Sequence, residues 1–344
     1  MSVLLAVVAF VISLVVTRRF CDPTSRFHIL DHPNDRSLHT QPTPRSGGLA
    51  ILAAIYLCGI AVDYWFGRPS DFSYAWIGGS SLLVAVVSYV DDHRTLSSGI
   101  RFIVHLSAAA ILAFGGLAVS RLELPGWDLS FPYWIGVIFT LLFVVWMVNL
   151  YNFMDGMDGF AGGMAVFGFG TFAVLGLLAG STLFSALNLI IAAAALGFLV
   201  FNFPPARIFM GDVGSSTLGF LAASMSLWAA HERFFPVWVA VLVYSPFVLD
   251  ATATLIRRLL RGEKVWQAHK THYFQKLVQA GWGHRKTVLL EYAIMLGCGA
   301  TALWGVHASD RLQWAMLAGW ALFYSVFFHW VSRLSARAHK SGTL

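Results

Sequence analysis

The sequence predicts an all-α integral membrane protein, a single bundle of about eleven transmembrane helices. Three observations support this prediction. First, 58% of the 344 residues are hydrophobic and only 12% are charged, whereas soluble domains are about one-quarter charged. Second, the mean hydropathy is +0.69, and the apolar residues gather into stretches near the length of about 20 residues that a spanning helix needs. Third, the basic residues concentrate in alternate connecting segments, as the positive-inside rule requires.

The apolar stretches follow one another with short polar connections. They cover residues 2–17, 47–65, 73–90, 102–119, 132–150, 160–180, 182–202, 214–230, 235–256, 287–306 and 312–332. The first stretch has Arg18 and Arg19 behind it and no basic residue in front, which favours a retained helix over a cleaved signal peptide. Because no internal repeat and no soluble segment stands out, we expect residues 1–344 to form one transmembrane domain.

The placement of arginine and lysine predicts an outer N-terminus and a cytoplasmic C-terminus. This orientation puts 19 of the 23 basic residues on the cytoplasmic side, which fits the positive-inside rule. The net charge of +6 is thereby explained by topology rather than by nucleic-acid binding. The three cysteines form no CxxC pair, so neither a disulfide framework nor a cysteine zinc site is expected. The cytoplasmic segments are 17–46, 91–101, 151–159, 203–213, 257–286 and the C-terminal tail.

Five polar clusters fall on this predicted cytoplasmic face, and the short outer loops hold nothing comparable. Their sequences include "DHPNDRSLHTQPTPRSGG", "YVDDHRTLSSGIR", "NLYNFMDGMDGFAGG", "FNFPPARIFMGDVGSS" and "WQAHKTHYFQKL". Ionisable residues near a bilayer are costly and are usually functional. The one-sided distribution therefore predicts an active site at the inner membrane surface.

Asp91 and Asp92 end the third apolar stretch. The C-terminus of a helix is unfavourable for negative charge, because the helix dipole is negative there. We therefore expect a cationic partner, either a metal ion or nearby basic side chains. The alternative is that both carboxylates are simply solvated.

The segment after the fifth stretch carries Asn149, Asn152, Asp155 and Asp158 at intervals of three residues. If the segment is helical, these four groups lie along one face. Glycines such as Gly156 would admit a ligand or a neighbouring helix. The alternative is a helix end held by amide hydrogen bonds between helices.

Asp212 stands between glycines directly before the eighth stretch. Ser215, Ser216 and the free N–H groups of that helix start would form an anion pocket. The alternative is that Asp212 only caps the helix.

His269 and His272 lie in the longest and most basic cytoplasmic segment. Two histidines alone are weak evidence for zinc, and the neighbouring lysines and arginines favour phosphate binding instead. Carboxylates prefer hard cations, and Mg²⁺ typically binds one or two carboxylates plus substrate phosphates. Together the clusters predict a Mg²⁺-dependent reaction between a soluble phosphate-bearing donor and a phosphate-bearing lipid.

The order of these motifs resembles the polyprenyl-phosphate N-acetylhexosamine-1-phosphate transferases. The resemblance rests on "PTPRSGG" before the second helix, "DD" after the third, "NLYNFMDGMDG" after the fifth, "FMGDVGS" before the eighth and "HKTHYFQKL" after the ninth. It extends over nearly the whole chain and is closer to the surface-polysaccharide branch than to the peptidoglycan branch.

The resemblance implies roles for individual residues. Phe209 would stack on uracil, Asn202 would contact the same base, and the two histidines would hold the diphosphate or the sugar of the donor. The implied catalytic residues are Asp91, Asp92, Asp212, His269 and His272. The implied ligands of Mg²⁺, or of Mn²⁺ in its place, are Asp212, Asp155 and Asp92. The implied substrate-binding residues are Arg45, Asn149, Asn152, Asp155, Gly156, Asp158, Asn202 and Phe209.

The implied reaction joins a UDP-N-acetylhexosamine to undecaprenyl phosphate in the bacterial inner membrane, with release of UMP, and starts an O-antigen or another surface glycan. We favour direct attack by the lipid phosphate over a two-step route through an aspartate, because a phosphomonoester with a second pKa of about 6 is largely ionised near pH 7. The sugar and the oligomeric state, including a homodimer, are left open.

Two other functions compete with this one. A transporter would place polar groups at the bilayer midplane, and Asp250 within the ninth stretch is the one such feature, although it could pair with Arg257. A Mg²⁺-dependent phosphotransferase with another soluble donor is the third hypothesis.

Overall fold

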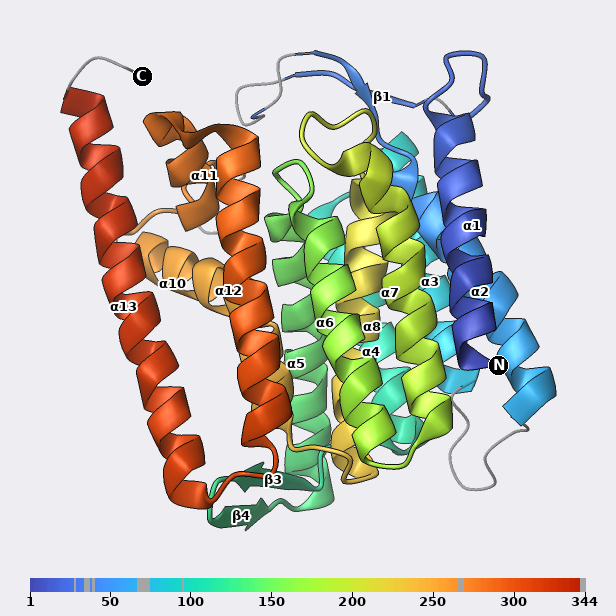
Figure 1. Cartoon of the computed structure of the whole chain (residues 1–344), viewed down its shortest axis with the longest axis vertical. Coiled ribbons are helices and arrows are strands. Elements are labelled where there is room, and N and C mark those ends of the chain that lie inside the picture. Colours follow the sequence, from blue (N-terminus) through green and yellow to red (C-terminus); the bar gives the residue numbers. More distant parts are fainter. Residues whose placement is uncertain are drawn as a thin grey trace.

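The computed structural model describes residues 1–27, 29–33, 38, 41–66, 75–94, 96–264 and 269–340. These residues form a helical bundle with two short antiparallel hairpins, β1–β2 and β3–β4 (Figure 1). The helices are α1 (Ser2–Phe20), α2 (Gly47–Phe66), α3 (Ala75–His93), α4 (Ser98–Leu112), α5 (Tyr133–Met154), α6 (Phe160–Leu178), α7 (Thr182–Asn202), α8 (Gly211–His231), α9 (Val237–Val243), α10 (Ser245–Leu260), α11 (Tyr273–Leu277), α12 (Gly283–Gly305) and α13 (Asp310–Lys340). The strands are β1 (Leu30–Asp31), β2 (Thr43–Pro44), β3 (Arg121–Leu124) and β4 (Trp127–Ser130).

The prediction of an all-α, multi-pass membrane protein is confirmed. Within the described residues, eight helices are long and apolar enough to cross a membrane, and a ninth span results if the bent pair α9 and α10 is counted as one. Two further predicted stretches coincide with α2, whose apolar part is Gly47–Val62, and with α3. The count of eleven spans and the orientation of the termini stay predictions.

The prediction of one continuous helix over 235–256 is wrong. The chain bends by 82° between α9 and α10. Pro246 lies in the first turn of α10, and a proline has no N–H with which to continue the hydrogen bonds of the preceding helix. The helix therefore ends at Val243 and restarts in a new direction. The restarted α10 carries the basic side chains Arg257 and Arg258 in its last turn.

Helix α8 lies at the centre of the bundle, where it is almost entirely buried, and packs against α2, α3 and α5. Small residues allow this packing. Gly214 faces Gly48 of α2 so closely that a Cβ on Gly214 would lie 2.7 Å from the Gly48 Cα. Close backbone approach through small residues is the usual way in which membrane helices gain van der Waals contact. The consequence is that the first turn of α8 lies directly beside the ends of its neighbours.

The two ends of the bundle differ. One end, which we call the polar end, carries the β1–β2 strands, the α5–α6 loop, α11 and the end of α13 (Figure 1). The opposite end carries the β3–β4 hairpin, and α1 runs from near this side toward the polar end. All thirteen residues to which the sequence assigns a site role lie toward the polar end. The fold therefore gathers segments that are up to 227 positions apart, from Arg45 to His272.

Candidate active site

Asp92, at the end of α3, supplies the cap of α8. Its Oδ1 accepts a hydrogen bond from the Asp212 N–H at 3.3 Å, and its Oδ2 accepts one from the Val213 N–H at 3.1 Å. Met210 occupies the capping position of α8 itself and makes no side-chain cap. The alternative that Asp212 caps this helix is therefore wrong. A carboxylate at a helix N-terminus is favoured by the helix dipole, so Asp92 joins α3 firmly to α8.

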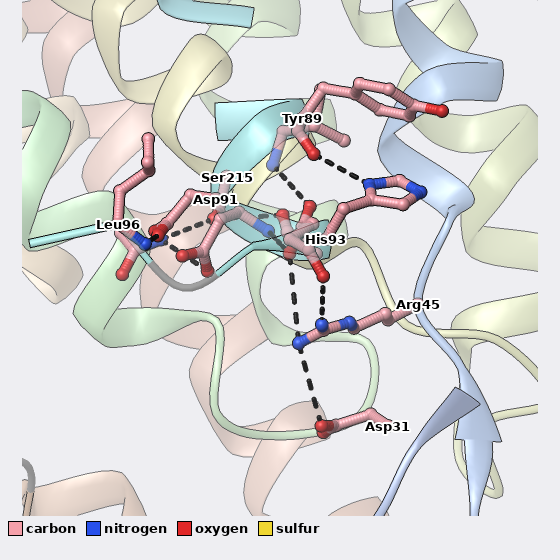
Figure 2. A network of polar contacts seen from close by, with 12 residues as sticks. Asp31, Arg45, Tyr89, Asp91, His93, Leu96 and Ser215 are labelled. Atoms are coloured by element: carbon pink, nitrogen blue, oxygen red, sulfur yellow. Dashed lines mark hydrogen bonds and ion pairs between the residues drawn. The ribbon is translucent and has the colours of Figure 1, made fainter. Parts of the chain in front are cut away.

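Arg45 brings the N-terminal loop to the end of α3. Figure 2 shows its guanidinium between Asp31 and the end of α3. It donates a hydrogen bond to the Asp92 backbone carbonyl, and its Nη1 lies 4.0 Å from the Asp92 Oδ1 and 3.9 Å from the Asp31 Oδ1. Arg45 is therefore the cationic partner that the sequence predicted for the C-terminus of α3. The adjoining Gly211 has a φ of +75°, and a Cβ there would lie 2.3 Å from the Arg45 carbonyl oxygen, so glycine is required.

Arg101, which the sequence analysis did not single out, joins Asp91 to Asp212. Its Nη1 donates to the Asp91 Oδ2 at 3.1 Å and lies 3.7 Å from the Asp212 Oδ2. Asp91 also accepts a hydrogen bond from the Leu96 N–H at 2.6 Å. Asp91 and Asp92 are thus not free solvated carboxylates, and each has a basic partner. Arg101 lies ten residues after Asp91, in the first turn of α4, so only the α3–α4 turn brings the two together.

Asn152 links α5 to the first turn of α8. Its Nδ2 donates to the Asp212 Oδ1 at 3.0 Å and to the Ser215 Oγ at 3.1 Å. The predicted alternative of amide hydrogen bonds between helices is therefore present at this position. Asn149 lies one turn back on α5, where its Nδ2 donates to the Val145 carbonyl. These bonds leave Asp212 with Asn152 on one side and Arg101 on the other.

The prediction that four polar groups form one helical line is wrong beyond Asn152. Helix α5 ends at Met154, and Asp155 has a non-helical conformation with φ −82° and ψ 45°. Asp155 and Asp158 therefore lie in the α5–α6 loop. Asp158 accepts a hydrogen bond from the Ala206 N–H at 2.9 Å and lies 2.9 Å from the His284 Nδ1. These contacts make Asp158 a connection between three segments of the polar end.

Asn202 completes this loop structure. It is buried, its Oδ1 accepts from the Gly159 N–H at 2.9 Å, and its Nδ2 donates to the Ile208 carbonyl at 2.8 Å. Its amide thus ties the α5–α6 loop to the segment before α8, and a contact with uracil stays a prediction. Phe209 lies in the same segment, half-buried, and its backbone bonds to Pro44 and Gly47. The backbone thereby places Phe209 beside the N-terminal loop.

The carboxylates at the centre of the site carry more negative charge than the nearby cations offset. Burial and the charges of Asp212 and Asp92 raise the pKa of Asp155 well above its usual value. Among the described residues no three acidic, histidine or cysteine side chains are arranged to hold a metal alone. Mg²⁺ needs no such cage, because substrate phosphates complete its oxygen shell. The crowded oxygen donors thus fit a hard cation that binds together with an anionic substrate.

A cavity of about 370 Å³ opens beside Asp212. It lies between the polar ends of α3, α4, α5 and α8. Its walls combine carboxylates, one arginine, amides and hydroxyls with two phenylalanines. The lining residues are Ser88, Asp91, Ser98, Gly99, Arg101, Phe102, His105, Asn149, Asn152, Phe153, Asp212 and Ser216. The site therefore has a polar chamber large enough for a phosphate group and its immediate substituents.

The histidine segment forms a second polar group around Asp250 of α10. The Asp250 carboxylate accepts hydrogen bonds from the Tyr273 and Phe274 N–H groups at 2.9 and 3.0 Å, and its Oδ1 lies 3.2 Å from the His272 Nδ1. The suggested pairing with Arg257 is wrong, because Arg257 donates to the Thr271 carbonyl instead. Asp250 therefore anchors α11.

His269 lies beside His272, with ring centroids 4.7 Å apart. Burial, His272 and Arg258 lower the pKa of His269 to about 4. His269 is therefore neutral near pH 7 and can act on a phosphate as a hydrogen-bond donor. A Cβ on Gly156 would lie 3.3 Å from the Gln275 Nε2 of α11. The α5–α6 loop thus borders both the Asp212 group and the histidine segment.

The sequence of this chain is similar to those of known proteins. Residues 74–230 match the model of glycosyl transferase family 4. A probable undecaprenyl-phosphate N-acetylglucosaminyl 1-phosphate transferase of Bacillus subtilis is 32% identical over 84% of this chain and 81% of its own length. A decaprenyl-phosphate N-acetylglucosaminephosphotransferase of Mycobacterium leprae is 30% identical over 78% of this chain and 74% of its own. A phospho-N-acetylmuramoyl-pentapeptide-transferase of Staphylococcus carnosus is 26% identical over 89% and 100%, respectively.

The fold and the polar site define a multi-pass membrane enzyme. The chain belongs to glycosyl transferase family 4 and is a phosphotransferase, so both the family and the enzyme class predicted from its motifs are confirmed.

Proposed function

We propose that this protein transfers N-acetylhexosamine 1-phosphate from a UDP-sugar to undecaprenyl phosphate and releases UMP. The observation that carries the proposal is Asp212, a carboxylate whose side chain is 38% exposed at a cavity that also contains Arg101. The relatives from Bacillus subtilis and Mycobacterium leprae are named as N-acetylglucosamine phosphate transferases, which makes UDP-N-acetylglucosamine the donor of choice. We place the product at the start of an O-antigen or another surface glycan.

Mg²⁺, or Mn²⁺ in its place, would be held by Asp212 and Asp155, with Asp92 contributing charge. When bound it would neutralise the diphosphate of the donor and the charge that develops on the departing UMP. The crowding of the three carboxylates supports this assignment, because an oxygen-rich site with uncompensated negative charge favours a hard cation.

The chain's own residues position two anionic substrates against each other. Arg101 and the N-terminus of α4 provide the positive groups that attract the acceptor phosphate. An oxygen of that phosphate forms the new bond to the β-phosphorus of the donor, and the bond from this phosphorus to the oxygen of the α-phosphate breaks. The oxygen and its electron pair leave with UMP. Such a transfer depends mainly on positioning and electrostatics.

We favour direct attack over an aspartyl-phosphate intermediate. Asp92 is engaged by two N–H groups of α8, and Asp91 is engaged by Arg101 and by the Leu96 N–H. Either carboxylate would have to break these hydrogen bonds before it could attack phosphorus as a nucleophile. Trapping of a phosphorylated aspartate during turnover would contradict direct attack.

We further propose that the polar end faces the cytoplasm of a bacterium and that the bundle lies in the inner membrane. The support is the positive-inside rule, because 19 of the 23 basic residues lie in the segments that the sequence predicts to be cytoplasmic. A fluorescent protein fused after the C-terminus should fold and fluoresce, and a periplasmic phosphatase inserted between β3 and β4 should be active. The reverse pattern would contradict this orientation.

The function is tested by incubating purified protein with undecaprenyl phosphate and a panel of UDP-N-acetylhexosamines, with UMP as the measured product. We expect UMP only when the lipid and Mg²⁺ are both present, with N-acetylglucosamine as the preferred sugar. Mn²⁺ should restore activity after chelation. Folded protein that releases no UMP with any donor would overturn the proposal.

A further inference from the structure

His105 is a buried histidine of α4 that none of the motifs includes. It is 6% exposed and lines the cavity beside Asp212. Among the described residues its Nδ1 has no hydrogen-bond partner. A buried polar atom without a partner costs about 1–3 kcal/mol. Because the imidazole that carries this atom lines the cavity, the side chain points to a ligand there.

The position of His105 relative to Arg101 indicates the charge of that ligand. The two residues are four positions apart on α4 and therefore share one face of the helix, and both line the cavity. Ser98 and Gly99, in the first turn of α4, line it as well. A guanidinium and a helix N-terminus favour an anion, and an imidazole N–H adds a further donor. Asp91 and Asp212 line the same cavity, so this wall is suited to a phosphate once the cation proposed at Asp212 offsets their charge.

The apolar surroundings distinguish between the two phosphate-bearing substrates. Phe102 and Phe153 line the cavity and are 52% and 38% exposed. Ile103, the next residue on α4, is 63% exposed. These side chains connect the polar chamber to the outer apolar surface of the bundle, where lipid chains lie. The hydrocarbon chain of a lipid phosphate can pack against these apolar side chains while its phosphate lies in the cavity. A soluble nucleotide carries no such chain.

We propose that His105 is a positioning residue for the acceptor, whose imidazole donates a hydrogen bond to an oxygen of the lipid phosphate beside Arg101. This inference rests on the proposed function, because it assigns one substrate of that reaction to a particular wall of the cavity. The nucleotide sugar binds on the other side of Asp212, toward the α5–α6 loop and the histidine segment.

The test compares the KM for each substrate in His105→Leu and His105→Gln. Leucine fills the space but donates no hydrogen bond, so the KM for undecaprenyl phosphate should rise about tenfold, while the KM for the UDP-sugar stays within about twofold. The amide of glutamine can donate, so His105→Gln should recover most of the lost affinity. The matched control is Ser107→Ala, because Ser107 is on the exposed side of the same helix and bonds only within it, to the Ile103 carbonyl. Its two KM values should stay unchanged.

Three results would overturn the inference: an unchanged lipid KM in His105→Leu, an equal rise in both KM values, or a glutamine variant no better than the leucine variant. If His105→Leu does not fold, His105→Asn replaces it, because the shorter amide cannot reach the same point and should raise the lipid KM. Wild-type protein without UMP release would refute the proposed function itself. Active wild-type protein with normal His105 variants would refute only the role of His105.

Discussion

Asp212 and Asp250 are two polar-end carboxylates with opposite surroundings. The Asp250 residue is 4% exposed and receives two backbone N–H bonds in addition to its contact with His272. The Asp212 side chain is 38% exposed, has Asn152 as its hydrogen-bonded side-chain partner, and lies 3.7 Å from Arg101. One carboxylate is fully used by the fold, whereas the other retains oxygen lone pairs toward a cavity.

The difference shows why the type of residue alone does not reveal a catalytic group. Both aspartates lie in or beside apolar segments, where an ionised group is costly. The fold offsets this cost at Asp250 with its own donors. At Asp212 the compensation is incomplete until a cation and an anionic substrate are present. We expect substitutions at the first site to affect stability and substitutions at the second to affect turnover.

The largest effect is expected for Asp212→Asn. The amide keeps the shape and the contact with Asn152 but loses the negative charge, so the rate of UMP release should fall by about a thousandfold. The midpoint of thermal unfolding should change by less than about 2 °C. A variant that retains wild-type turnover would remove Asp212 from the catalytic machinery.

Asp250→Ala should show the reverse behaviour. Removal of this carboxylate leaves two buried N–H groups and His272 without their acceptor, and breaking such a buried polar arrangement costs about 3–5 kcal/mol. The unfolding midpoint should drop strongly, while kcat of the fraction that remains folded should fall far less than in Asp212→Asn. If stability is unchanged and kcat collapses, Asp250 belongs to the chemistry and the comparison fails.

Arg101→Gln should have an intermediate effect. The loss of a charge-assisted hydrogen bond to Asp91 and of the positive charge near Asp212 should lower kcat/KM for the lipid about 10- to 100-fold. Arg101→Lys keeps the charge without the fork-shaped geometry and should recover part of the activity. Equal losses in the two variants would show that charge is not what Arg101 contributes.

The smallest effect is expected from the pH dependence of His269. Its pKa of about 4 in the folded protein lies below the value of about 6.5 in an unfolded chain. Between these values the unfolded chain binds more protons, so the stability contributed by neutral His269 is present above pH 6.5 and is lost as the pH falls toward 4.

Unfolding midpoints at pH 7.5 and pH 5.0 measure this loss. His269→Gln cannot titrate and should lose about 1–2 °C less than the wild type over this interval. A variant that loses as much as the wild type would show that the folded and unfolded pKa values of His269 do not differ.

Much of the architecture could be predicted, and the failures have a local cause. Long apolar stretches specify membrane helices almost regardless of context, and each predicted stretch coincides with a helix in the described residues. The exception is the stretch 235–256, in which α9 ends at Val243 and α10 begins at Ser245 with Pro246 in its first turn. The apolar composition of this stretch did not reveal the 82° bend between the two helices. The helical line through Asp155 failed because α5 stops at Met154 and Asp155 adopts a non-helical conformation, which the three-residue spacing of the polar groups did not reveal.

The sequence by itself determined the membrane class, the family and the set of polar segments, because these depend on composition, on spacing along the chain and on motif order. Only the tertiary structure decided what each polar residue does. Asp92 became the cap of α8, Asp250 the anchor of α11, and Arg101 the partner of two carboxylates. Hydrogen bonds and ion pairs act over about 3–4 Å, and which groups come that close depends on how the helices pack, through contacts such as Gly48 against Gly214.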